Sequence, residues 1–223
     1  MVADTSSGDE LWIITTLPEA SRPGVSGGGI VYHHRQAPDS SAYIYMFRGS
    51  EEPEVIRYED QHQPLPGESP AWAHGERLVF KSCAGGICGL YITEGVNDGT
   101  GITRITTDFN DTNPEASPDG KKIAFMSRRD VNWEIYVMDL ESYTVERLTE
   151  NAASDGLPIW SPDGQTIGFA SDRSGEWAVW AMNPDGSNQR MLFALGGSLH
   201  GDVWNALLRE RDKWVEERLS WGP

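Results

Sequence analysis

The sequence predicts an all-β protein, a β-propeller of about four four-stranded blades. Three observations lead to this prediction. A segment of similar sequence recurs along the chain, each copy divides into short strands, and the clearest copies share one turn motif. The prolines at Pro70, Pro114 and Pro158 mark the repeat, because they stand 44 residues apart and begin similar stretches. Repeats of this length are typical of propeller blades.

The shared motif is the turn Ser-Pro-Asp-Gly, at residues 117–120 and 161–164. Proline fixes one backbone angle of the turn, aspartate bonds to neighbouring amides, and glycine takes the positive φ that closes a hairpin. In the copy that begins at Pro70, Ala-His-Gly replaces this turn. A weaker and shorter copy begins at Pro23, so four units cover residues 21–198.

Short alternating runs follow each turn, as expected for half-buried strands. In the third unit the runs are residues 123–127, 133–139 and 145–149, separated by loops at 128–132 and 141–143. Together with the strand before the turn they give four antiparallel strands. Each such sheet is expected to pack an apolar face on the next around a channel.

We divide the chain into three parts. Residues 1–20 are an N-terminal segment with one strand at 11–16, residues 21–198 are the propeller, and residues 199–223 are a C-terminal amphipathic helix. The termini or a partner can complete the ring to more than four blades. In the helix, apolar residues at three- and four-residue steps form one stripe, expected to dock on the chain's own propeller or on another subunit: Trp204, Leu208, Trp214, Val215 and Leu219.

The repeat also resembles a known family. The string Pro-x-Trp-Ser-Pro-Asp-Gly-x-x-Ile-x-Phe, followed by Arg-Leu-Thr in the third unit, is similar to the WD40-like repeat of TolB-family propellers. The match is strong in residues 111–149 and 155–192, moderate in the unit at Pro70 and weak in the first. The resemblance implies a protein-interaction platform, often outside the cytoplasm. Nothing resembles the α/β domain that precedes the TolB propeller or a nucleophile elbow, so peptidase activity is not carried over.

Charge and hydropathy exclude several classes of partner. Eighteen Lys and Arg against 34 Asp and Glu give a net charge of −16, which disfavours nucleic acids and anionic membrane surfaces. The longest apolar runs fall far short of the ~20 residues that cross a bilayer, so no membrane insertion is expected. The N-terminus lacks a signal-peptide pattern, which fits a cytosolic chain or a mature segment. The resemblance favours a periplasmic or extracellular location and leaves the cytoplasm open.

Cys83 and Cys88 flank a four-residue hairpin loop, which places them opposite each other on neighbouring strands. This spacing suits a disulfide. The alternative is a pair of reduced structural thiols, and a zinc site is a poorer explanation because no second cysteine pair exists. The compartment that the resemblance implies and the single pair favour the disulfide.

Asp111 and Asp155 recur at the start of the innermost strand of two blades, where loops crowd the mouth of the channel. Their carboxylates can serve a cation or a basic group of a partner, or they can bond turn amides. Residues 108–115 have the composition of a calcium loop but lack its central glycine and the spacing to a bidentate Glu. Calcium is therefore possible but unsupported, and no cofactor is expected.

Trp133 and Trp177 open the third strand of their units beside a loop. Exposed aromatics beside acidic loops form protein or glycan contact surfaces, and core packing is the alternative. The hypothesis for function is a non-catalytic scaffold that assembles with a protein partner or with copies of itself. The alternative is a propeller hydrolase or lyase that acts on glycan or peptide at the channel mouth, with Asp111 and Asp155 as acid and base.

Overall fold

A computed structural model describes residues 20–26, 29–35, 41–48, 53–57, 63–96 and 101–196, together with Leu219. Its strands form four antiparallel sheets of four strands, and each sheet is a simple meander. This arrangement confirms the predicted all-β propeller class. The predicted strand at 11–16 lies outside the described residues, and so does the C-terminal helix apart from Leu219.

The four sheets follow the chain as blades 1 to 4. Blade 1 contains β1 (Ala20–Ser26), β2 (Gly29–Arg35), β3 (Ala42–Phe47) and β4 (Glu54–Val55). Blade 2 contains β5 (Glu68–Ala73), β6 (Arg77–Ser82), the short 3-10 turn η1 (Ala84–Gly86), β7 (Gly89–Thr93) and β8 (Ile102–Arg104). Blade 3 contains β9 (Thr112–Ala116), β10 (Lys122–Ser127), β11 (Glu134–Asp139) and β12 (Val145–Arg147). Blade 4 contains β13 (Asp155–Trp160), β14 (Ile167–Ser171), β15 (Ala178–Met182) and β16 (Arg190–Ala194).

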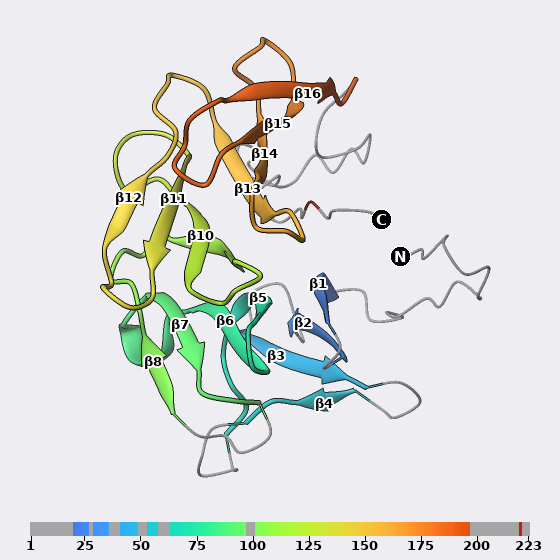
Figure 1. Cartoon of the computed structure of the whole chain (residues 1–223). Coiled ribbons are helices and arrows are strands. Elements are labelled where there is room, and N and C mark those ends of the chain that lie inside the picture. Colours follow the sequence, from blue (N-terminus) through green and yellow to red (C-terminus); the bar gives the residue numbers. More distant parts are fainter. Residues whose placement is uncertain are drawn as a thin grey trace, which may run out of the picture.

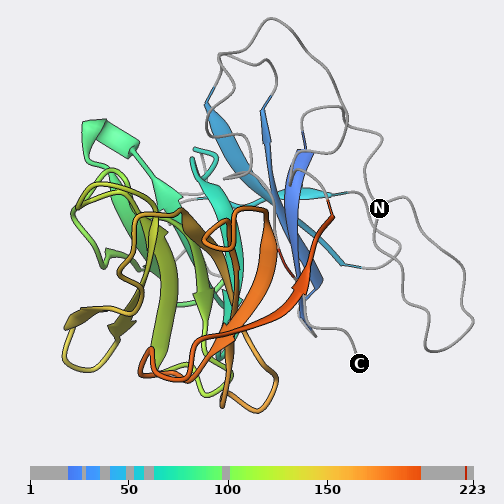
Figure 2. The same cartoon turned by 90° about the horizontal axis from the view of Figure 1, so that it is seen from above.

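The blades succeed one another around an arc, from blade 1 in blue to blade 4 in orange (Figure 1). The view from above shows the same succession with the sheets side by side (Figure 2). Neighbouring blades contact through their innermost strands, β1 with β5, β5 with β9, and β9 with β13. The innermost strands therefore line the axis of the arc, and the fourth strands lie outermost.

The Ser-Pro-Asp-Gly turns join the two inner strands of blades 3 and 4. In blade 4 the Ser161 hydroxyl donates to Asp163 at 2.6 Å, and the Gln165 amide donates to the same carboxylate at 3.0 Å. Gly164 has a φ of 69°, a backbone conformation that residues with a side chain rarely adopt. These turns (117–121 and 161–166) and the β11–β12 and β15–β16 turns lie at one end of the blades, which we call the turn face.

Apolar side chains fill the spaces between blades, because alternate residues of a strand point to opposite faces of the sheet. Phe125 and Tyr136 are paired across β10 and β11, and their rings stack with centroids 5.7 Å apart. They belong to one cluster with Val79 and Leu90 of blade 2. The opposite face of blade 3, including Met126, joins blade 4 in another cluster. The sheet of blade 3 is thus buried between blades 2 and 4.

Two tryptophans of the innermost strands tie blade 2 to blade 1 and blade 4 to blade 3. The Trp72 indole in β5 donates to the backbone oxygen of Gly29 at 2.9 Å, and the Trp160 indole in β13 donates to that of Glu115 at 3.2 Å. The apolar ring packs while its N–H is satisfied across the interface. Leu219, the one described residue of the tail, packs against the cluster shared by blades 3 and 4.

Candidate functional site

The loops opposite the turn face form the candidate site. In a four-stranded meander, the loop between the second and third strands lies at the same end as the connection to the next blade. We call this end the loop face and define it by residues 83–88, 105–111, 128–133, 148–154 and 172–177. Asp111 belongs to this set, and Asp155, the first residue of β13, directly follows it in the chain.

Asp111 lies next to β9 and is completely buried. The Arg129 guanidinium, from the β10–β11 loop, donates to both carboxylate oxygens at 2.7 Å. The guanidinium also lies 5.3 Å from the ring centre of Phe125 and 4.8 Å from that of Tyr136. The Ser127 hydroxyl accepts a hydrogen bond from the Arg129 amide at 3.2 Å, and this bond fixes the loop that presents the arginine.

Blade 4 repeats this arrangement. Asp155 is completely buried and accepts a hydrogen bond from Arg173 at 2.6 Å. Arg173 lies 5.2 Å from the Phe169 ring and 4.8 Å from the Trp180 ring. Its amide and its Nε donate to Ser171 at 3.2 and 3.0 Å. The sequence repeat therefore encodes a buried ion pair that is shielded by two aromatic rings.

The structure gives both aspartates a partner from within the chain. Each carboxylate binds an arginine 18 residues further along the chain. Sequence reasoning missed these arginines. The signal was present, because Ser-x-Arg begins at the last residue of the second strand in both strong repeats, at Ser127 and again at Ser171.

A third buried carboxylate, Glu134, joins blades 3 and 4. Its carboxylate accepts hydrogen bonds from the Arg147 guanidinium at 2.8 Å and from the Asn151 backbone amide at 3.2 Å. The side chain of Asn151 donates to Asp155 at 2.6 Å. Burial raises the pKa of Glu134, against the hydrogen bonds that lower it, and the nearby Asp155 raises it further. Within the described part of the chain, one oxygen of Glu134 and one of Asp155 have no hydrogen-bond partner.

Of the two tryptophans predicted as possible contact residues, Trp133 belongs to the core and Trp177 lies at its edge. Trp133 is 9% exposed, and the guanidinium of Arg128 lies 5.5 Å from its ring centre. Trp177 is partly buried and packs against the same cluster. The structure therefore places both rings in the packing between blades 3 and 4.

Other apolar side chains project from the loop face. Ile87, Phe109 and Val131 are 52%, 67% and 85% exposed, each in a different loop. Phe109 sits in a tight turn whose shape is set by Asp108, which accepts the Asn110 amide at 2.8 Å. Sequence reasoning missed these three residues. The alternating pattern of one sequence identifies strands, but it does not show which side chains of the loops between them are exposed.

A disulfide joins Cys83 and Cys88 and closes the β6–β7 loop that carries Ile87. The two cysteines lie directly beyond Ser82 and Gly89, which are paired across β6 and β7. The hairpin brings the sulfur atoms together, and the bond restrains one edge of the loop face.

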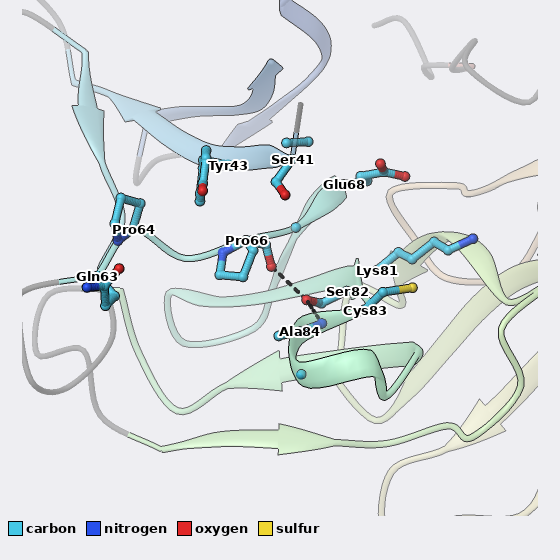
Figure 3. Close-up of a pocket in the computed structure, with 13 residues that line it drawn as sticks. Ser41, Tyr43, Gln63, Pro64, Pro66, Glu68, Lys81, Ser82, Cys83 and Ala84 are labelled. Carbon is cyan, nitrogen blue, oxygen red and sulfur yellow. Dashed lines mark hydrogen bonds between the residues drawn. The ribbon is translucent and has the colours of Figure 1, made fainter. Parts of the chain in front are cut away.

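A pocket of about 510 Å³ lies on the loop face where blade 2 meets blade 1 (Figure 3). Its lining includes Tyr43, Glu68, Lys81, Ser82 and Ala84. The Ser82 hydroxyl donates to the oxygen of Pro66 at 2.7 Å and accepts the Ala84 amide at 3.3 Å. The pocket thus combines neutral polar groups with one acidic and one basic side chain.

In residues 20–196 with the gaps stated above, and at Leu219, no three His, Cys, Asp or Glu side chains are grouped as metal ligands. Over the same residues, no helix has the length and hydropathy to cross a bilayer.

Comparisons with known proteins agree with this architecture. Residues 69–206, more than half of the chain, match the PD40 family, described as the TolB beta propeller domain. A Tol-Pal system protein TolB from Francisella tularensis is 35% identical over 101 residues, which are 44% of this chain and 22% of that protein. The chain thus matches less than a quarter of the length of this relative.

Two solved structures share the fold. A putative TolB from Agrobacterium tumefaciens superposes with a TM-score of 0.65 and 23% identity, over 81% of this chain and 63% of the other. TolB from Acinetobacter baumannii gives a TM-score of 0.64 and 22% identity, over 78% and 43%. The family match and the four meander sheets lead to the same conclusion: the chain belongs to the TolB beta-propeller family.

Proposed function

We propose that this chain is a non-catalytic interaction module whose loop face binds a protein partner. The observation that carries the proposal is the exposure of Ile87, Phe109 and Val131 on three loops of one face. Large apolar side chains that protrude from a rigid scaffold are suited to insert into a partner's surface. The disulfide and the buried ion pairs hold these loops in place, so little conformational entropy is lost on binding.

The family supports a partner of a particular kind. The Francisella relative is named as a protein of a Tol-Pal system. We propose that this chain assembles with another protein of such a system. Its net charge of −16 favours a partner surface rich in lysine and arginine.

The buried ion pairs argue against the alternative of a hydrolase or lyase. That hypothesis needs Asp111 and Asp155 as acid and base within reach of a substrate. Both side chains are completely buried, and each is bound to an arginine. A carboxylate in such a pair has no free path to a glycan or peptide.

The disulfide supports a location outside the cytoplasm. Bonds of this kind persist in oxidising compartments and are rare where thiols are kept reduced. We therefore propose a periplasmic or extracellular protein, in agreement with the compartment implied by the repeat.

The experiment is a capture assay with purified candidate partners from a Tol-Pal system. Phe109→Asp and Val131→Asp should each remove most of the captured protein. Tyr143→Asp is the matched control, because Tyr143 is 55% exposed but lies on the turn face. Equal capture by all three variants would contradict the proposal.

A further inference from the structure

Blade 2 keeps the framework of the buried ion pair but lacks the pair itself. Phe80 and Tyr91 are paired across β6 and β7, as Phe125 and Tyr136 are across β10 and β11. Their rings stack with centroids 6.0 Å apart. Ser82 follows Phe80 by two residues, in the position that Ser127 holds in blade 3.

In this register, Ala84 stands where blade 3 has Arg129. The Ala84 amide donates to the Ser82 hydroxyl at 3.3 Å, and the Arg129 amide donates to the Ser127 hydroxyl at 3.2 Å. The backbone that presents an arginine is therefore retained, while the side chain is reduced to a methyl group. At the start of the blade, Gly67 stands where blade 3 has Asp111.

The pocket of about 510 Å³ lies at these substituted positions, since Gly67, Ser82 and Ala84 all line it (Figure 3). The aspartate cannot be restored at residue 67. A Cβ there would lie 2.7 Å from atoms of Ile44 and Phe80. The carboxylate of the pocket is instead that of Glu68, which is 38% exposed and forms an ion pair with Arg35.

We propose that this pocket receives the arginine side chain of a protein partner. The proposal rests on the proposed function, because it assumes that the loop face binds a protein. Blades 3 and 4 carry their own arginine at the position of Ala84. In blade 2 this side chain is a methyl group at the edge of the pocket, which has room for a guanidinium supplied from outside. Glu68, which already pairs with Arg35 through one oxygen, accepts the guanidinium of the partner with its remaining acceptor capacity. The planar guanidinium matches the geometry of a carboxylate. The acidic chain adds a long-range attraction.

The test uses the full chain and blocked tripeptides. Acetyl-Gly-Arg-Gly-amide is the probe. In the two control peptides the central residue is lysine, which keeps the charge without the planar guanidinium, or citrulline, which keeps the shape without the charge. Amide resonances of residues 82–85 are followed by NMR during titration. We expect the arginine peptide to shift these resonances and to bind about tenfold more tightly than the lysine and citrulline peptides. Free L-arginine tests a small-molecule source and should bind more weakly than the peptide.

Two variants locate the site. Ala84→Arg supplies the side chain from within the chain and should abolish peptide binding, while Glu68→Gln should weaken it about tenfold. Ser142→Arg on the turn face adds the same charge as Ala84→Arg and should leave binding unchanged. Circular dichroism melting curves establish that each variant is folded, and Glu68→Gln alone decides the matter if Ala84→Arg does not fold.

Three results would overturn the proposal: equal affinity for arginine and lysine peptides, binding that survives both Ala84→Arg and Glu68→Gln, or preference for free arginine. None of them would affect the capture of a partner through Phe109 and Val131. Failure of the pocket is therefore distinguishable from failure of the proposed function.

Discussion

The guanidinium of Arg129 donates to both oxygens of the Asp111 carboxylate at 2.7 Å. Asp111 is completely buried, so removing its partner leaves a charge in the protein interior. We expect Arg129→Ala to lower the free energy of unfolding by about 3 kcal/mol. Lys121→Ala, in an exposed turn, should change it by less than about 0.5 kcal/mol. Urea denaturation curves of the two variants give the comparison.

A double substitution tests whether the loss of stability comes from the unpaired, buried charge of Asp111. Asp111→Leu with Arg129→Met removes both charges and keeps apolar volume, and such replacements are often neutral. The double variant should recover most of the stability that Arg129→Ala loses. A double variant that is less stable than Arg129→Ala would show that the pair itself stabilises the blade.

The disulfide between Cys83 and Cys88 closes a short loop. Thiol titration of the denatured, unreduced protein should find no free thiol. Replacing both cysteines by serine should lower the free energy of unfolding by about 2 kcal/mol, the value that loop-closure entropy gives for so short a loop. Two free thiols in protein purified without reductant would contradict the assignment.

The turn aspartates should titrate at low pH. The hydroxyl of Ser161 and then the amide of Gln165 hold the pKa of Asp163 below its ordinary value of 3.8. The folded form therefore binds its proton less readily than the unfolded form, and the contribution to stability is present above 3.8 and lost as the pH falls through the folded pKa. NMR titration should show this low value, and Ser161→Ala should raise it. An unchanged pKa in Ser161→Ala would contradict the assigned cause.

The tail should support blades 3 and 4, because Leu219 packs against their shared cluster. Leu219→Asp is expected to lower the free energy of unfolding by about 2 kcal/mol, since it places a charge against apolar surface. Deletion from Gly201 onward should have a larger effect. Mass in solution before and after deletion distinguishes support within one chain from a role in assembly. Unchanged stability and mass in both variants would refute the predicted docking of the stripe Trp204, Leu208, Trp214, Val215 and Leu219.

The sequence predicts the blades well because their turns and alternation are local. The strand ends are less predictable, since side chains compete with the backbone ladder there. The run at residues 145–149 predicts a fourth strand that ends at Thr149, but β12 stops at Arg147. The reason is that the Thr149 hydroxyl accepts the Ile135 amide at 2.9 Å, which satisfies that amide without a strand. Blade 1 shows the same limit, because its repeat is weak and its fourth strand is only Glu54–Val55.

The candidate site was harder to predict than the fold. Single positions such as Asp111 stand out in a repeat, but their partners become visible only when loops from different strands are brought together in space. Arg129 is 18 residues from Asp111, and the two meet because the β10–β11 loop returns to the start of β9. The pocket in blade 2 could not be predicted from single residues, because Gly67 and Ala84, which line it, carry no functional group in their side chains.

Hydrogen–deuterium exchange of the purified complex shows whether the loop face binds a protein partner. Binding should slow exchange in residues 105–111 and 128–133, the loops that carry Phe109 and Val131. The turns at residues 140–144 and 183–189 should exchange as in the free chain. Protection confined to the turn face, with no change in the loops, would show that the partner does not bind the loop face.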